Sequence, residues 1–272
     1  MESKYLLAYI RGFILGVIIV CLVELGKEYY LSIQHKKYLE NLSSAIKLEE
    51  HTEETYAGTV DDIVEVNVPN TEMQKESIMD KFIELYAENS DLIGWISIPD
   101  TVIDYPVMQC ADNEFYLYHD FYKREDRYGC LYVKDMADVN TPGTNFVIYG
   151  HNMKDGTMFG ALDKYEDKSF YEKHQRIVFD TLYEERTYEI MSVFLSNANG
   201  DAETGFKYYQ FYQADTEEEF AYFYDNIMSM SLYDTGVTAE FGDTFLTMST
   251  CAYHEEDGRI VVVAKRSDNL SY

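Results

Sequence analysis

From Leu92 onward the chain consists of short β-rich runs separated by turn residues, and this pattern constrains the fold more than any other feature. Runs rich in Val, Ile, Thr, Tyr and Phe, bounded by Gly, Pro, Asn and Asp, are typical of β-strands. We expect eight strands, at residues 94–98, 102–107, 129–133, 145–149, 176–181, 187–194, 244–250 and 260–265. Eight short strands in one domain favour a closed β-barrel.

Helices are expected at several places around these strands. Residues 159–165 and 216–230 have helical patterns, and Thr216 precedes three glutamates, which suits an N-cap followed by carboxylates at the positive end of the helix dipole. A further helix over residues 71–88 carries an apolar stripe that we expect to pack on the body of the domain. The predicted fold class is mainly β with helices: a barrel with N-terminal helices and a helix before strand seven.

The N-terminus is apolar enough to suggest a membrane anchor. Residues 12–23 are uncharged, and residues 5–25 approach the about 20 residues that a bilayer-crossing helix needs. Lys4 and Arg11 precede the run and Glu24 follows it, which predicts a cytoplasmic N-terminus and an external remainder. A cleaved signal peptide is the alternative, but no clean small-x-small site follows, so we prefer an uncleaved anchor. Both interpretations export the rest of the chain.

The 272 residues suffice for one sizeable core with appendages. We divide them into a transmembrane signal anchor (1–26), a stalk helix with an acidic linker (27–70) and a catalytic domain with its N-terminal helix (71–272). Helix formers fill residues 27–50, whereas residues 51–70 are polar, acidic and interrupted by Gly58 and Pro69.

The formal net charge of -27 excludes one class of partner. Binding to phosphates depends on clustered Lys and Arg, so we expect no nucleic-acid partner. No group of Cys and His residues has the spacing of a metal site, so we expect neither a metal nor an organic cofactor.

Three residues carry the chemistry that the sequence suggests: Cys251, His151 and Arg259. A thiol attacks a carbonyl carbon well only as the thiolate, and a neighbouring imidazole can take its proton and later return it to a leaving amine. A guanidinium can neutralise the charge on a tetrahedral oxyanion. We expect Cys251 to end the seventh strand, Arg259 to begin the eighth across an antiparallel pair, and His151 to follow strand four, where Gly150 would allow a tight turn.

Each of these residues also has a less specific interpretation. Cys251 could be a buried inert thiol, since free cysteine is among the most buried residue types. His254 is the chief rival to His151 as the base, Arg259 could simply pair with carboxylates of the loop at residues 252–258, and Arg186 is a weaker alternative cation. Cys110 and Cys130 would be external, so a disulfide between them is an option that the sequence leaves open.

The motifs around these residues resemble those of class B sortases. The resemblance covers residues 71–266 and rests on WISIP (95–99), IDYPV (103–107), NEFYL (113–117), HDF (119–121), YGHNM (149–153), GTMFG (156–160), STC (249–251) and GR (258–259). Each motif is weak alone, but the set is specific. Met248 stands where the family often has Leu, a swap of similar volume.

The resemblance implies a membrane-anchored cysteine transpeptidase on the outer face of a Gram-positive bacterium. Cys251 would attack a threonine carbonyl in a C-terminal sorting signal of the LPxTG or NPxTN type, and an amine of a peptidoglycan precursor or of a pilin lysine would resolve the thioester. His151 would act as acid and base, and Arg259 would hold the carbonyl or its oxyanion. Asn113, Leu117 and Ser249 match positions that line the signal-binding groove.

Other functions remain open at this point. A cysteine hydrolase would use the same three residues and let water resolve the acyl enzyme, and an inactive membrane-tethered binding module would not need Cys251. The loop between Cys251 and Arg259 is short and acidic, so we assign no carboxylate to catalysis.

Overall fold

The computed structural model of the chain describes residues 2–56, 77–197, 205–251 and 258–267, with the side chains of residues 2–4, 6–9, 48–56 and 251 left out. By internal contacts the chain divides into two compact units, Met1–Ser44 and Ala45–Tyr272. One helix, α1 (Glu2–Tyr56), includes the whole of the predicted stalk helix. Most of the predicted acidic linker, residues 57–70, lies outside the described residues.

The membrane anchor predicted over residues 5–25 is not supported. Among the described residues, we find no helix with a stretch long and apolar enough to cross a membrane.

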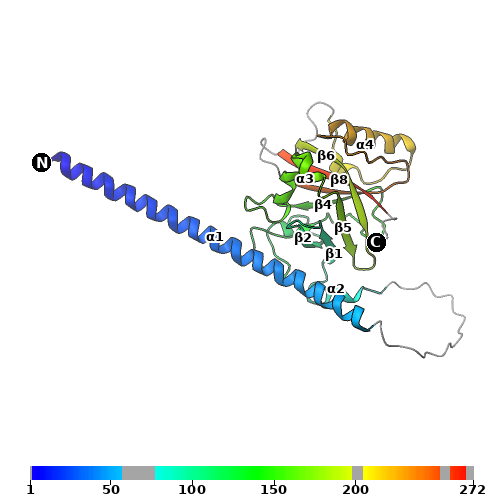
Figure 1. Cartoon of the computed structure of the whole chain (residues 1–272), viewed down its shortest axis with the longest axis horizontal. Coiled ribbons are helices and arrows are strands. Elements are labelled where there is room, and N and C mark those ends of the chain that lie inside the picture. The colour runs from blue at the N-terminus through cyan, green and yellow to red at the C-terminus, as the bar shows by residue number, and fades with distance from the viewer. Residues whose placement is uncertain (1, 57–76, 198–204, 252–257, 268–272) are drawn as a thin grey trace, which may run out of the picture. The chain divides into compact units, whose positions relative to one another are not determined.

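The second unit contains a closed barrel of eight strands, as the strand pattern predicted (Figure 1). The strands are β1 (Leu92–Ser97), β2 (Asp104–Met108), β3 (Leu131–Tyr132), β4 (Asn145–Gly150), β5 (Arg176–Thr181), β6 (Thr187–Asn197), β7 (Phe245–Cys251) and β8 (Gly258–Arg266). Their order around the barrel is β1-β2-β3-β4-β7-β8-β6-β5. The pairs β2–β3 and β4–β7 are parallel, and the other neighbouring pairs are antiparallel.

Differences from the predicted strand boundaries follow from the pairing. β6 continues beyond Phe194 to Asn197 because each added residue has a partner at the start of β8, as Ser196 has in Arg259 and Asn197 has in Gly258. β3 is reduced to two residues, because Leu131 and Tyr132 alone pair with β2 and only Tyr132 pairs with β4. The length of a strand thus depends on its neighbours as well as on its own residues.

One short helix precedes the first strand, and the others lie between strands. They are α2 (Asp80–Glu88), η1 (Phe115–Leu117), η2 (Phe159–Glu166), α3 (Lys168–Tyr171) and η3 (Tyr208–Gln210). The stretch predicted as a helix at residues 159–165 is a 3₁₀ helix. The helix predicted over residues 71–88 begins only at Asp80, although residues 71–76 lie outside the described part of the chain. Its residues Phe82 and Leu85 are buried, as the apolar stripe predicted.

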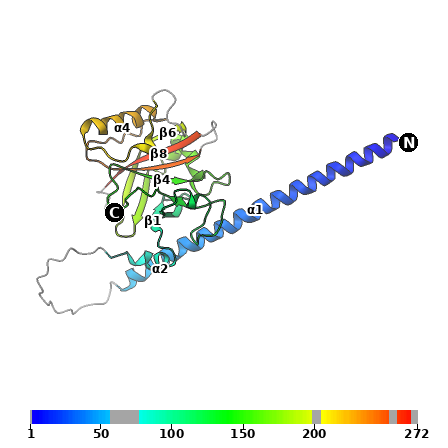
Figure 2. The ribbon, with the colours of Figure 1, turned by 180° about the vertical axis from the view of Figure 1, so that it is seen from behind.

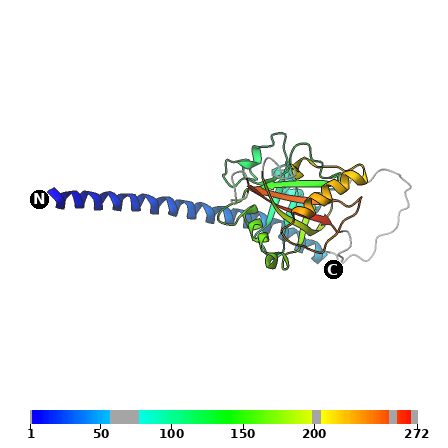
Figure 3. The ribbon, with the colours of Figure 1, turned by 90° about the horizontal axis from the view of Figure 1, so that it is seen from above.

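The helix before strand seven is α4 (Glu217–Met230), and it lies along β6 and β8 on the outside of the barrel (Figures 2 and 3). The predicted cap is confirmed, because the hydroxyl of Thr216 accepts the backbone N–H of Glu219 at 3.2 Å. The carboxylate of Glu219 in turn accepts the N–H of Asp215 at 2.8 Å.

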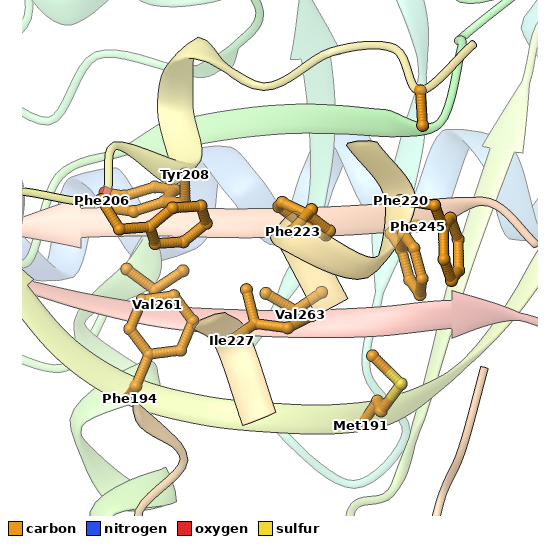
Figure 4. Close-up of a cluster of buried hydrophobic side chains, with 11 residues drawn as sticks. Met191, Phe194, Phe206, Tyr208, Phe220, Phe223, Ile227, Phe245, Val261 and Val263 are labelled. Carbon is orange, nitrogen blue, oxygen red and sulfur yellow. The ribbon is translucent and has the colours of Figure 1, made fainter. Parts of the chain in front are cut away.

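A cluster of buried side chains joins α4 to the barrel (Figure 4). It brings together Phe220, Phe223 and Ile227 from α4 and residues from three strands and from the segment before the helix, namely Met191, Phe194, Phe206, Tyr208, Ala214, Phe245, Val261 and Val263. This packing fixes the segment that runs from η3 to α4 against the outer face of β6, β7 and β8.

Candidate active site

The three residues singled out for chemistry lie at the ends of three adjacent strands, β4, β7 and β8. Gly150, the last residue of β4, pairs with Thr250 of the parallel strand β7, so His151 and Cys251 each follow this last matched pair. Cys251 pairs directly with Arg259 across the antiparallel β7–β8 ladder. Since adjacent strands are about 4.8 Å apart, the backbones of the three residues form one short row with Cys251 in the middle.

The imidazole of His151 is held by a backbone carbonyl. Its Nε2 lies 2.8 Å from the carbonyl oxygen of Leu117 in η1. A carbonyl oxygen can only accept, so Nε2 carries the proton and the neutral ring has Nδ1 available as the base. The ring is half-buried, and the ring of Tyr118 lies 6.2 Å away, centroid to centroid. Leu117 therefore fixes the orientation and tautomer of His151 much as a carboxylate does in a catalytic triad.

Gly150 has a different role from the one predicted. It is not among the glycines with positive φ, so it does not provide a left-handed turn before His151. A Cβ at this position would lie 2.3 Å from Cδ2 of Leu131 and 2.9 Å from Cδ2 of Phe159, both fully buried residues. Glycine is required because the end of β4 packs tightly against η2 and β3.

The segment after His151 returns to it. The backbone carbonyl of His151 accepts the N–H of Phe159 at 2.9 Å, and Asn152 forms an isolated bridge with Met158. The side chain of Asn152 is buried and donates to Asp163 in η2 at 2.7 Å. These contacts explain why the GTMFG motif accompanies the histidine motif in the sequence.

Arg259 is half-buried in β8, between Cys251 of β7 and Ser196 of β6. Its Nη1 donates to the carbonyl of Gly258 at 2.9 Å, which holds the guanidinium close to its own backbone. A planar guanidinium at this place can donate to an oxygen near the residue opposite it on β7.

The three residues predicted to line a groove have distinct surroundings. Asn113 donates to the Asp135 carboxylate at 2.9 Å and accepts the Asp135 N–H at 2.7 Å, so it ties the segment after β3 in place. Leu117 is half-buried and supplies the carbonyl that holds His151. Ser249 is only 2% exposed, and its hydroxyl shares a hydrogen bond of 2.7 Å with the hydroxyl of Tyr208.

Two contributors to the site could not be identified from the sequence. The Leu117 carbonyl belongs to the backbone, so no residue type signals it. Tyr208 is one of 26 tyrosines, and nothing near it in the sequence marks it as the partner of Ser249.

The rival residues differ in what the structure describes of them. His254 and the loop at residues 252–257 lie outside the described residues. Arg186 is buried and pairs with Glu184 at the turn between β5 and β6. Cys110 and Cys130 are both free thiols, and burial raises the pKa of Cys130 well above its usual value, so this thiol is poorly suited to act as a nucleophile. Within the described residues, no three His, Cys, Asp or Glu side chains are arranged to hold a metal ion.

Comparisons with known proteins agree with this geometry. The sortase domain family matches residues 96–267. Sortase B of Listeria monocytogenes is 33% identical over 195 residues, which cover 69% of this chain and 74% of that protein. Among solved structures, a Staphylococcus aureus sortase B-substrate complex superposes with a TM-score of 0.70 at 28% identity, covering 86% of this chain and 96% of that one. A sortase B complexed with triglycine superposes with a TM-score of 0.70 at 27% identity, covering 86% and 97%.

The barrel and these matches define the class of protein: the chain belongs to the sortase family, whose members are cysteine transpeptidases. Its relatives and structural neighbours are sortase B proteins, so within the family it is a sortase of class B.

Proposed function

We propose that this sortase cleaves a C-terminal sorting signal after its threonine through a thioester on Cys251, and that it transfers the protein to an amine of the cell wall. The observation that supports this most is the row formed by His151, Cys251 and Arg259 at the ends of three adjacent strands. We place the reaction on the outer face of the cell. The signal is of the LPxTG or NPxTN type.

In the first half of the reaction, the Cys251 thiolate attacks the carbonyl carbon of the threonine, and the Arg259 guanidinium donates to the oxyanion that forms. Collapse of the tetrahedral intermediate breaks the C–N bond, and the imidazolium of His151 gives its proton to the leaving amine. The thioester and a neutral imidazole remain.

In the second half, an amine attacks the thioester carbonyl while His151 accepts a proton from the attacking nitrogen. Collapse breaks the C–S bond, so an amide forms and the Cys251 thiolate is regenerated. Throughout both halves Nε2 of His151 donates to the Leu117 carbonyl, so Nδ1 is the atom that exchanges protons.

An amine acceptor is supported by the relatives, since triglycine, which is bound to one sortase B, has a free amino terminus. Transfer to peptidoglycan is our preferred role. A pilin lysine as the acceptor and hydrolysis by water are the alternatives, and both use the same three residues.

A peptide assay tests the proposal. Wild-type protein mixed with an LPxTG or NPxTN peptide and with triglycine should cleave after threonine and form the triglycine adduct, which chromatography with mass spectrometry detects. Cys251→Ala and His151→Ala should each lower kcat/KM by at least about 1,000-fold, because the loss of one member of a catalytic unit costs about as much rate as the loss of all of them. Cys110→Ala, which also removes a free thiol, should leave the rate unchanged.

Two outcomes would contradict the proposal. Full cleavage by Cys251→Ala or His151→Ala would exclude these residues from the chemistry. Cleavage with release of only the free acid at saturating triglycine would favour the hydrolase.

A further inference from the structure

A cavity of about 220 Å³ is lined on one side by β4, the strand that ends directly before His151. The segment after β3 (residues 134–143), four residues of β4 and the pair Tyr212 and Gln213 form its walls. Tyr149 lines the cavity and pairs with Ser249, one step before the Gly150–Thr250 pair that precedes His151 and Cys251. The cavity is smaller than the about 300–1,000 Å³ typical of pockets for whole small molecules. It therefore suits one side chain or one terminal group.

Lys134 supplies the positive charge in this cavity. Its Nζ lies 5.5 Å from the centroid of the Tyr149 ring and 5.9 Å from that of the Tyr209 ring. Two aromatic faces therefore hold the ammonium group in place through cation–π attraction. Over the described residues, no carboxylate forms an ion pair with Lys134. The ammonium group is thus oriented and partly shielded from water, and it retains donors for an incoming group.

The carboxylate that also lines the cavity has partners of its own. Asp138 accepts the Thr141 hydroxyl at 2.6 Å and the Asn140 N–H at 2.9 Å. These bonds from Thr141 and Asn140 lower the pKa of Asp138, so it is ionised at neutral pH and bound within its own loop. The phenol of Tyr149 adds no negative charge to the cavity, because burial raises its pKa and keeps it neutral.

We propose that this cavity is a subsite for a carboxylate of a peptide substrate, bound by the Lys134 ammonium group. The inference rests on the proposed peptide transfer at Cys251, whose strand β7 pairs with the cavity-lining strand β4. A carboxylate forms a charge-assisted hydrogen bond with an ammonium group, and such bonds are about twice as strong as neutral ones. The net charge of -27 would otherwise repel acidic substrates, so a local cation is needed to accept one.

The carboxylate could come from either substrate: an acidic side chain of the sorting signal, or the terminal carboxylate of the amine acceptor. Two arms of one experiment distinguish them. In the first arm, kcat/KM is measured for sorting peptides that carry Glu or Gln at each position near the threonine. In the second, triglycine is compared with triglycinamide as the acceptor. Both arms use about 0.15 M salt, which limits the Debye length to about 8 Å and suppresses the long-range field.

In one of the two arms, the rate that wild-type protein shows with the acid should be about five times its rate with the amide. This ratio corresponds to the upper range of the energy of a partly exposed ion pair. Lys134→Gln should reduce this ratio to about one. Lys164→Gln is the matched control, because Lys164 also sits over an aromatic ring, that of Phe170, but does not line the cavity. This control should retain the wild-type ratio.

Equal rates for acid and amide in both arms, or a preference that survives Lys134→Gln, would overturn the subsite. These outcomes differ from failure of the proposed function, in which wild-type protein cleaves none of the peptides, including the neutral ones.

Discussion

At the residue scale, Gly150 limits how closely the strands of the site can pack. An alanine Cβ there would overlap Leu131 and Phe159, which are both fully buried. Overpacking of this kind costs about 1–3 kcal/mol, and relief would come from moving the end of β4, which carries His151. Gly150→Ala should therefore lower both the free energy of unfolding, measured by urea denaturation, and kcat/KM for the sorting peptide.

A second glycine provides the control. A Cβ at Gly16 in α1 meets no atom within 4 Å, so Gly16→Ala should leave activity unchanged and should not destabilise the chain. If Gly150→Ala proved as stable and active as wild type, close packing would not be the reason for this glycine.

Residue types indicated the three candidate residues at the strand ends, but not the groups that contact them. Cys, His and Arg have side chains whose chemistry is readable in a sequence, and their motifs placed them at strand ends. That Ser249 lines a groove stays a prediction, and the structure adds that its buried hydroxyl shares a hydrogen bond with that of Tyr208, a partner 41 positions away. A long-range contact between two common polar residues leaves no local pattern in the sequence.

At the element scale, α4 connects the stability of the molecule to its site. Phe223 is fully buried in the cluster that also contains Tyr208, the hydrogen-bond partner of Ser249, two residues before Cys251 (Figure 4). Phe223→Ala should cost about 3–5 kcal/mol of unfolding free energy, since it leaves a cavity among well-packed side chains. Because Tyr208 would lose part of its support, kcat/KM should fall as well.

Tyr222 on the same helix offers a comparison, since its side chain is 56% exposed. Tyr222→Ala should change the unfolding free energy by less than about 1 kcal/mol. Equal losses in the two variants would show that the cluster does not secure the helix.

The sequence predicted the elements themselves in part. Alternating burial in β5, where every second residue is buried, is the pattern on which strand prediction depends, and both ends of β5 were predicted correctly. β6 was predicted too short, because its last residues owe their conformation to β8. The stretch at residues 159–165 was predicted to be helical, but periodicity alone did not predict the 3₁₀ form.

At the scale of the whole molecule, closure of the barrel brings the residues of the candidate site together. His151 is 100 residues from Cys251 in the sequence, and only the parallel pairing of β4 with β7 brings the two positions together. Local patterns predicted the individual strands, but the order β4-β7-β8 is a property of the complete barrel. The strand pattern predicted that Cys251 and Arg259 are neighbours, whereas the approach of His151 was suggested only by the resemblance of its motifs to a known family.

The most direct test of this convergence is to capture the acyl enzyme. Wild-type protein is mixed with a sorting peptide in the absence of an amine, quenched in acid at short times, digested and analysed by mass spectrometry. We predict an adduct on Cys251 with the mass of the peptide up to and including its threonine, which disappears when triglycine is added. Cleavage without any adduct, or an adduct on Cys110 or Cys130 instead, would contradict the account.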